Sequence, residues 1–303
     1  MDNDPAVFFS VIVPTYNRAK LIGDTLQSLL SQTYAGFEIL VIDDGSTDNT
    51  KEVMERWVKR DDRVKYFVKQ NGERGAARNY GIERAQGTYI TFIDSDDLAY
   101  TGHLQYAYEY LKQKSWPECY AQAYEIKEKA SGKVLVHAKH IAADTANEEL
   151  LKGNFLSCIG VFVKKEVLQD LRFEEDRNFA GTEDWLLWLQ LSARYPIFFS
   201  NTVTASMLEH DTRSVLSFPE DKLVYRAEHL KKKLTEDEVF SAEYGKDAIN
   251  ALYAHMLTYT SLHLAMSGKK RSALRYLLKA ARTDFKEIQS RRTLAIIKKV
   301  TIG

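Results

Sequence analysis

Residues 87–97 read Gly-Thr-Tyr-Ile-Thr-Phe-Ile-Asp-Ser-Asp-Asp, and this stretch decides the fold. Its first half is rich in β-branched and aromatic residues and holds no charge, which is typical of a buried strand. Its second half changes abruptly to acidic residues at Asp94, Asp96 and Asp97. A buried strand that ends in carboxylates indicates a sheet whose edge binds a ligand.

The same alternation of strand and helix precedes this stretch. Apolar runs predict strands over 8–13, 37–42, 64–68 and 88–93, and helical spacing predicts helices over 19–31, 50–60 and 75–85. Repeated strand–helix units form parallel sheets with helices on both faces. We therefore expect an α/β fold whose ligand lies at the carboxyl ends of the strands.

The remaining chain is less regular. The pattern predicts a hairpin over 118–126 and 133–136, a strand over 157–164, a helix over 183–194, and only helices from about 218. Three regions are expected: 1–115 with the repeated units, 116–217, and the helical region 218–303.

Composition excludes several classes of protein. The 303 residues, 45% of them hydrophobic, suffice for a proper core. Lys and Arg number 42, as do Asp and Glu, so no basic excess points to nucleic acid. Cys119 and Cys158 lack metal-site spacing. The start of the chain does not resemble a signal peptide. No apolar run reaches about 18 residues, the nearest being Tyr253 to Met266, so we expect a cytoplasmic protein.

Asp94 and Asp96 form a D-x-D pattern directly after a strand. Two carboxylates spaced in this way can bind Mg²⁺ or Mn²⁺ together with the phosphates of a substrate. The same residues are also typical of a turn or a helix cap. D-x-D alone therefore does not decide between these interpretations.

Two other predicted strands end in polar segments. Asp43-Asp44-Gly45-Ser46 can accept hydrogen bonds from a base or a ribose, although an Asp-Gly turn explains it equally well. Pro14-Thr15-Tyr16-Asn17 can place an aromatic ring beneath a nucleobase, or can be an ordinary loop. All three segments are expected at one edge of the sheet.

Taken together, four segments resemble the successive blocks of the family-2 nucleotide-sugar glycosyltransferases, which have the GT-A fold. They are 11–17 (VIVPTYN), 41–48 (VIDDGSTD), 75–81 (GAARNYG) and 87–97 (GTYITFIDSDD). The resemblance is strong over 8–115 and loose over 116–215. It implies a mostly parallel sheet flanked by helices, a nucleotide-sugar-binding half in 1–115, an acceptor-binding half in 116–217, and a C-terminal helical extension.

The resemblance also assigns the donor site. It implies that Asp44 holds the base and that Arg78 lies near the nucleotide, although an arginine on a helix surface is an equal alternative. The segment that lines the nucleoside falls on Pro14, Thr15, Tyr16 and Asn17.

Within the D-x-D block, the resemblance implies that Asp94 lies near the ribose and Asp96 on the metal, with Ser95 between them at the donor. Asp97 is expected to cap the following helix. In a later segment of the H-x-x-S type, His210 is expected to complete the metal or diphosphate site, with Arg213 near phosphate oxygens; a polar surface loop is the alternative.

The family's catalytic base is an aspartate that often follows a glutamate at the start of a helix. Glu183-Asp184 fits this pattern, which assigns the base to Asp184. An acidic first turn is also common because anions suit a helix N-terminus. The chemistry needs a base, since the acceptor hydroxyl must lose its proton when it attacks the anomeric carbon.

The implied activity is a metal-dependent, inverting transfer from a nucleotide-sugar, expected to be a UDP-sugar, to a saccharide or lipid-linked acceptor in polysaccharide or glycoconjugate synthesis. The chain lacks the Q-x-x-R-W segment of processive synthases, which favours single transfers. A sugar nucleotidyltransferase would carry a Gly-rich segment where residues 14–17 lie. A degenerate nucleotide-sugar-binding or scaffold protein is the non-enzymatic alternative.

The stretch from Lys269 onward is rich in Lys and Arg and ends in apolar residues. Such a segment can rest on an anionic membrane surface, where a lipid-linked acceptor would be found. A solvated basic helix face and a homodimer surface are the alternatives. We therefore expect a cytoplasmic location with peripheral contact at the inner face of the membrane.

Overall fold

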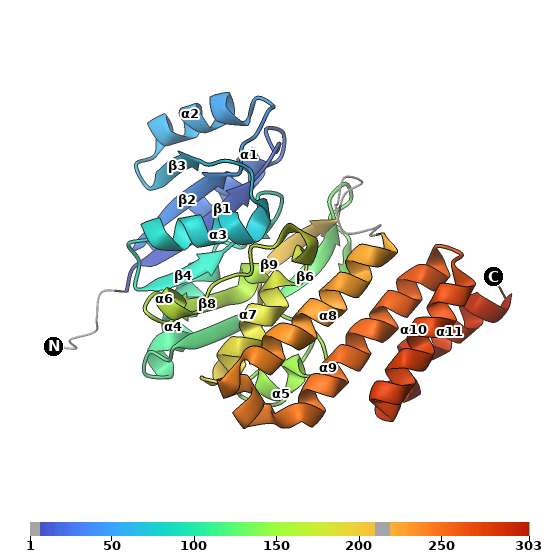
Figure 1. The fold of residues 1–303 in the computed structure, drawn as a ribbon. Helices are drawn as coiled ribbons and strands as arrows, with labels where there is room; N and C mark the ends of the chain where they lie inside the picture. Colours follow the sequence, from blue (N-terminus) through green and yellow to red (C-terminus); the bar gives the residue numbers. More distant parts are fainter. Residues whose placement is uncertain (1–6, 210–218, 303) are drawn as a thin grey trace. The chain divides into compact units, whose positions relative to one another are not determined.

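The strand that precedes Asp94 lies inside a nine-stranded mixed sheet of the computed structural model, which describes residues 7–209 and 219–302 (Figure 1). The described chain divides into two units. The first gathers residues 7–146, 155–187 and 195–209, and contains the sheet. The second gathers residues 147–154, 188–194 and 219–302, and is helical.

The parallel half of the sheet confirms the strand–helix repeats. Its strands, in the order β3-β2-β1-β4, are β1 (Phe9–Thr15), β2 (Phe37–Asp43), β3 (Val64–Val68) and β4 (Tyr89–Phe92). The intervening helices are α1 (Ile22–Leu30), α2 (Thr50–Arg60) and α3 (Glu73–Arg84). Thr15 is in register with Asp43, so the loops after β1 and β2 leave the sheet at the same edge.

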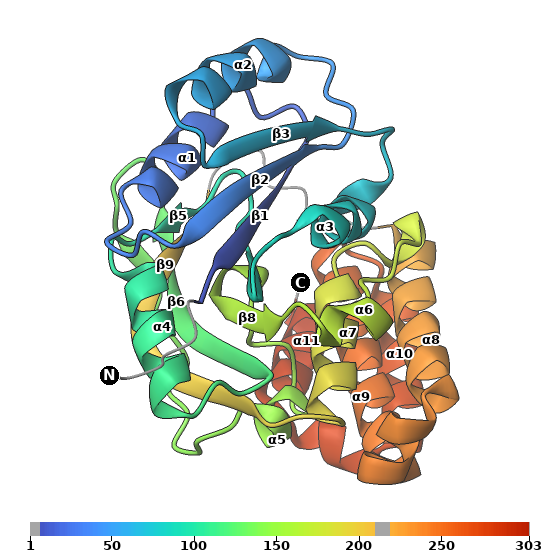
Figure 2. The same ribbon diagram turned by 90° about the vertical axis from the view of Figure 1, so that its left-hand side faces the viewer.

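Helices cover both faces of this half, as predicted (Figure 2). Alternate side chains of β1 and β2 pack against α1, α2 and α4 (His103–Gln113). On the other face, Ile12 lies directly against Gly81 of α3. Because strand side chains alternate between faces, this double burial explains why most residues of β1 and β2 are apolar. Among the buried exceptions, Ser10 and Glu38 are hydrogen-bonded to each other at 2.6 Å.

The second half of the sheet is mixed. Its strands are β5 (Leu98–Ala99), β6 (Cys119–Glu128), β7 (Val134–Val136), β8 (Val161–Lys164) and β9 (Ile197–Glu209). β8 pairs antiparallel with β4 and β6, and β6 and β7 form the predicted hairpin. β9 was not predicted, and it pairs in parallel with β6. Short helical segments lie between β7 and β9 in the chain: α5 (Asn147–Leu150), η1 (Cys158–Gly160), α6 (Val167–Asp170), η2 (Arg177–Phe179) and α7 (Glu183–Ser192).

In the second unit, every element from residue 219 onward is a helix, as predicted. These elements are α8 (Glu220–Glu236), α9 (Glu238–Met266), α10 (Lys270–Thr283), η3 (Phe285–Gln289) and α11 (Arg291–Ile302). Helices α8, α10 and α11 all contact α9. Asp237 begins α9 by accepting a hydrogen bond from the Phe240 N–H at 3.0 Å.

The long helix α9 carries buried hydroxyl groups that return hydrogen bonds to backbone carbonyls. Thr260 donates to Met256 at 2.9 Å, and Ser261 donates to Ala273 at 2.7 Å. These groups interrupt the apolar run that ends at Met266. None of the helices in the described part of the chain is both long and apolar enough to cross a membrane.

Candidate active site

The loops after β1 and β2 are joined by hydrogen bonds. The Asp44 N–H donates to the Thr15 carbonyl at 2.9 Å. Asn17, whose φ of 54° is left-handed, accepts from the N–H groups of Thr47 and Asp48 at 2.8 and 3.2 Å. The predicted donor residue Asn17 thus holds the neighbouring loop. Pro14 and Thr15 are buried, whereas the Tyr16 side chain is 46% exposed and can lie against a ligand.

Asp44 is buried and its carboxylate is fixed in place. One oxygen accepts from Lys69 Nζ and from the Gly72 N–H, both at 2.8 Å. The other accepts from the Glu73 N–H at 2.8 Å. Carboxylates are stabilised at the positive N-terminus of a helix, here α3. The contact with a base that the sequence predicts for Asp44 stays a prediction.

The acidic loop after β4 approaches the loop after β1. Arg18 Nε lies 3.5 Å from a carboxylate oxygen of Asp96. Arg18 directly follows Asn17 but was not among the site residues predicted from the sequence. The Asp94 side chain is 34% exposed and that of Asp96 17%, whereas Ser95 is buried. Asp94, predicted near the ribose, and Asp96, predicted on the metal, therefore lie on an accessible loop.

The prediction for Asp97 was wrong. The short strand β5 follows it, rather than a helix. Its carboxylate is buried and accepts a hydrogen bond from the Leu208 N–H at 3.0 Å. Asp97 therefore ties the acidic loop to β9, and the sequence could not show this because β9 lies far along the chain.

Arg78 links the acidic loop to the predicted base segment. Its side chain is 2% exposed, which excludes the alternative of an arginine on a helix surface. One guanidinium nitrogen donates to Asp94 at 2.8 Å and another to Glu183 at 3.0 Å. The D-x-D loop and the Glu183-Asp184 pair are thus neighbours. A direct contact between Arg78 and the donor stays a prediction.

Helix α3 also holds the loop that leads to Glu183. The Asn79 amide donates to the Phe173 carbonyl at 2.8 Å and accepts from the Phe173 N–H at 3.0 Å. A Cβ added to Gly75 would lie 2.4 Å from the Glu174 carbonyl oxygen, so only glycine fits there. The segment Gly75 to Asn79 therefore positions the base segment, a role that the sequence analysis missed.

Asp184 and Glu183 have different environments. Glu183 is buried; burial would raise its pKa, but the guanidinium groups of Arg74 and Arg78 lower that pKa below its usual value. Burial and the neighbouring Glu183 raise the pKa of Asp184 to about 6. One Asp184 oxygen accepts from the Trp185 N–H at 2.7 Å, and the other forms no hydrogen bond within the described residues. A half-buried carboxylate of this kind suits a general base near neutral pH.

A divalent cation would depend on few protein ligands. Within 7–209 and 219–302, no three or more His, Cys, Asp or Glu side chains are gathered to hold a metal ion. His210 and Arg213, predicted for the metal and phosphate site, lie outside the described residues. The two accessible acids of the 94–96 loop still fit Mg²⁺ or Mn²⁺, because such ions are often bound by one or two carboxylates together with substrate phosphates.

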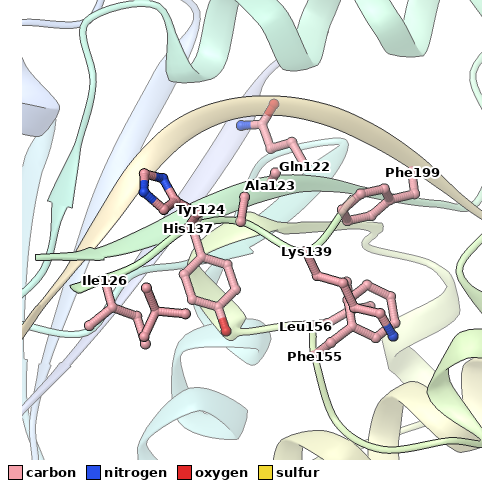
Figure 3. A pocket seen from close by; sticks show the side chains of 11 residues that line it. Gln122, Ala123, Tyr124, Ile126, His137, Lys139, Phe155, Leu156 and Phe199 are labelled. Carbon is pink, nitrogen blue, oxygen red and sulfur yellow. The ribbon is translucent and has the colours of Figure 1, made fainter. Parts of the chain in front are cut away.

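Figure 3 shows a separate pocket of about 170 Å³ in the second half of the sheet. It is lined mainly by apolar and aromatic side chains, and none of the predicted site residues lines it. Its walls come from β6, β7, β9 and the segments at 137–139 and 155–156, and include Tyr124, Ile126, His137, Lys139, Phe155 and Phe199.

The chain is similar in sequence to known glycosyltransferases. The family model described as Glycosyl transferase family 2 matches residues 10–172. The GalNAc(5)-diNAcBac-PP-undecaprenol beta-1,3-glucosyltransferase of Campylobacter jejuni is 32% identical over 269 residues, which cover 82% of each chain. An uncharacterized glycosyltransferase of Rickettsia conorii is 34% identical over 188 residues, or 62% of this chain. That match spans only 30% of the Rickettsia protein.

Two solved structures share the fold. Residues 1–349 of TarS from S. aureus, in complex with UDP-GlcNAc, align with a TM-score of 0.60 and 21% identity, covering 95% of this chain and 90% of that one. The mannosyltransferase PcManGT from Pyrobaculum calidifontis, in complex with GDP-Man and Mn²⁺, aligns with a TM-score of 0.57 and 18% identity, covering 98% and 88%. These similarities confirm the predicted fold.

Proposed function

The chain belongs to glycosyl transferase family 2 and has the GT-A fold, and on this premise we propose that it transfers a sugar from a nucleotide diphosphate to an acceptor hydroxyl with inversion. The observation that carries the proposal is the pair of bonds from Arg78 to Asp94 and Glu183. This buried cation bonds both to Asp94, which is expected at the donor, and to Glu183, which directly precedes the proposed base Asp184.

The donor half of the proposal rests on the loops after β1, β2 and β4. Tyr16 offers an exposed ring for the nucleobase, since aromatic stacking suits any base. Asp44 is held by backbone N–H groups and Lys69, and a carboxylate keeps lone pairs for a base or ribose donor. Pro14, Thr15 and Asn17 form the frame of this loop pair, and Asp94 and Ser95 continue the site towards the sugar.

Asp184 is the proposed base. Its oxygen without a hydrogen bond can accept the proton of an acceptor hydroxyl as that hydroxyl attacks the anomeric carbon. The C–O bond to the acceptor forms while the bond to the diphosphate breaks, and the nucleoside diphosphate carries away the bonding electrons. A single displacement of this kind inverts the anomeric centre.

Asp96, with His210 as a second candidate outside the described residues, would hold a divalent cation. When bound, Mn²⁺ or Mg²⁺ would stabilise the negative charge that develops on the departing diphosphate. Arg18 lies 3.5 Å from Asp96, and its positive charge would also favour a diphosphate bound at this loop. PcManGT, which shares the fold, is in complex with GDP-Man and Mn²⁺.

We further propose a UDP-sugar donor and a saccharide or lipid-linked acceptor, in polysaccharide or glycoconjugate synthesis. TarS is in complex with UDP-GlcNAc, and the Campylobacter relative is named as a glucosyltransferase for an undecaprenol-linked glycan. A Bacillus subtilis relative, 30% identical over 183 residues, is named a putative teichuronic acid biosynthesis glycosyltransferase. The alternative of a degenerate binding protein conflicts with the intact acids at 44, 94, 96 and 184.

A donor panel tests the proposal. Release of nucleoside diphosphate from UDP-, GDP- and dTDP-sugars is measured with Mn²⁺, with Mg²⁺ and with a chelator. We expect release from a UDP-sugar that needs the cation, and a loss of about tenfold or more in cation-dependent UDP affinity for Asp96→Asn. Asp170→Asn, the same change at an exposed acid, is the control and should behave as the wild type. Binding without release from any donor would favour the degenerate protein instead.

A further inference from the structure

Positive charge is concentrated at the C-terminal end of this chain. Lys and Arg balance Asp and Glu over the whole sequence at 42 each. Residues 269–303 nevertheless contain eleven Lys and Arg against only Asp284 and Glu287. The rest of the chain therefore carries the compensating negative charge. Such segregation within a neutral protein is typical of a surface that meets an anionic partner.

The same stretch exposes large apolar side chains. Leu274 and Leu278 of α10 are 42% and 58% exposed, and Phe285 of η3 is 65% exposed. Leu294 and Ile297 of α11 are 69% and 46% exposed. Single exposed apolar residues are common, but five within 24 residues form a concentration that calls for a partner.

The apolar and basic side chains share helical faces. On α10, Arg271 precedes Leu274 by three positions and Arg282 follows Leu278 by four, so these residues are neighbours on the helix surface. On α11, Arg291 and Lys298 flank Leu294 in the same way. Helices α10 and α11 contact each other. We call these seven residues, with Ile297, the basic–apolar surface: Arg271, Leu274, Leu278, Arg282, Arg291, Leu294, Ile297 and Lys298.

The cations of this surface lack acidic partners in the described part of the chain, unlike their neighbours. Arg275 pairs with Glu220 at 2.7 Å and Lys279 with Glu228 at 2.8 Å. Arg271, Arg282, Arg291 and Lys298 take part in no such ion pair within residues 7–209 and 219–302. Their charges are therefore available to an external anion.

We propose that the basic–apolar surface binds the headgroup region of an anionic lipid bilayer. Lipids supply phosphate groups for the four cations and hydrocarbon for the leucines, whereas nucleic acid has phosphates but no hydrocarbon chains. A symmetric dimer through this surface would place like charges opposite one another. Because the other faces of α10 and α11 are buried against α9, the contact is shallow and depends on charge.

This proposal does not depend on the transferase activity. If both hold, membrane contact keeps the protein on the surface where a lipid-linked acceptor lies. Vesicles without any acceptor test the contact by itself, and donor turnover in solution tests the proposed activity by itself. Either can fail while the other stands.

The experiment measures co-sedimentation of the full chain with vesicles of phosphatidylcholine alone, and with vesicles containing about one third phosphatidylglycerol. We expect binding only to the anionic vesicles and release at high salt, because screening weakens exposed charges. Reversing the charge at Arg271, Arg282 and Lys298 to Glu should lower the vesicle affinity by about tenfold or more. Replacing Leu278 and Leu294 by Gln should lower it several-fold.

The matched control reverses Lys51, Arg56 and Lys59, which are exposed on α2, to Glu. It changes the net charge by the same amount and should leave binding unchanged. Three results would overturn the proposal. The protein could bind anionic and neutral vesicles equally, or the α2 control could lose as much vesicle affinity as the surface variant. The third is that the wild type and the α2 control are dimers whereas the surface variant is a monomer. The last result would assign the surface to a second copy of the chain.

Discussion

The loops around Arg78 and the helices α10 and α11 use charge in opposite ways. Arg78 and Glu183 are both buried and form an ion pair across 105 positions of sequence, and Arg78 also pairs with the partly exposed Asp94. On α10 and α11 most of the cations are exposed, and several lack an ion-pair partner among the described residues. A buried charge is costly unless paired, whereas an exposed one costs little. Substitutions should therefore damage stability and chemistry in the first region, and only external binding in the second.

Breaking the buried pairs should have the largest effect on stability. Arg78→Met removes the guanidinium group that lies 3.0 Å from the buried carboxylate of Glu183. We expect the free energy of unfolding to fall by about 3 to 5 kcal/mol, measured by urea denaturation. The control Lys232→Met breaks a pair with Glu236 that is largely exposed, and should cost at most about 1 kcal/mol. An equal fall in the free energy of unfolding for both variants would contradict the difference between buried and exposed ion pairs.

The close contact at Gly75 should matter more for chemistry than for stability. Gly75→Ala places a methyl group against the Glu174 carbonyl, so the loop leading to Asp184 must shift. A misplacement of this size can lower turnover by about 100-fold. The control Gly23→Ala meets its nearest atom, on Trp57, at 4.0 Å and should leave turnover unchanged. Wild-type turnover of Gly75→Ala would show that this loop does not position the base.

The smallest expected effect is a shift in the pH profile of kcat/KM, and the direction of this shift tests the coupling between Glu183 and Asp184. The pKa of Asp184 is raised to about 6, so kcat/KM should fall as the pH drops below that value and Asp184 becomes protonated. Glu183→Gln removes the neighbouring negative charge, which favours the ionised form of Asp184. The acid limb of the profile should then move to lower pH, whereas exposed Glu166→Gln should leave it in place. A shift to higher pH would contradict the proposed coupling.

The sequence predicted the features that depend on local pattern. Strands β1, β2 and β4 are mostly apolar, and the acids at 44, 94 and 96 lie just beyond the ends of β2 and β4. It could not show which distant segments meet. The bond between Arg78 and Glu183 spans 105 positions, and Asn79 meets Phe173 across 94. No local signal distinguishes such a buried arginine from one on the surface of a helix.

Strand β9 shows a second limit. It contains polar residues such as Thr204, which apolar periodicity does not detect. Thr204 is nevertheless buried, and its hydroxyl lies 3.0 Å from Nδ1 of the buried His103. The strand is stabilised by pairing with β6, which is more than 70 residues earlier in the chain. The wrong prediction for Asp97 has the same origin, because its partner Leu208 belongs to β9.

The central claim is that Asp184 takes the proton of the acceptor while other residues hold the donor. The direct test compares Asp184→Asn with Asp170→Asn, using the donor that the panel identifies and water or an added sugar as acceptor. Donor affinity is measured by calorimetry, and turnover by release of nucleoside diphosphate. The account predicts donor affinity within about twofold of the wild type and a loss of turnover of about 10²- to 10⁴-fold for Asp184→Asn alone. Wild-type turnover in that variant would contradict it.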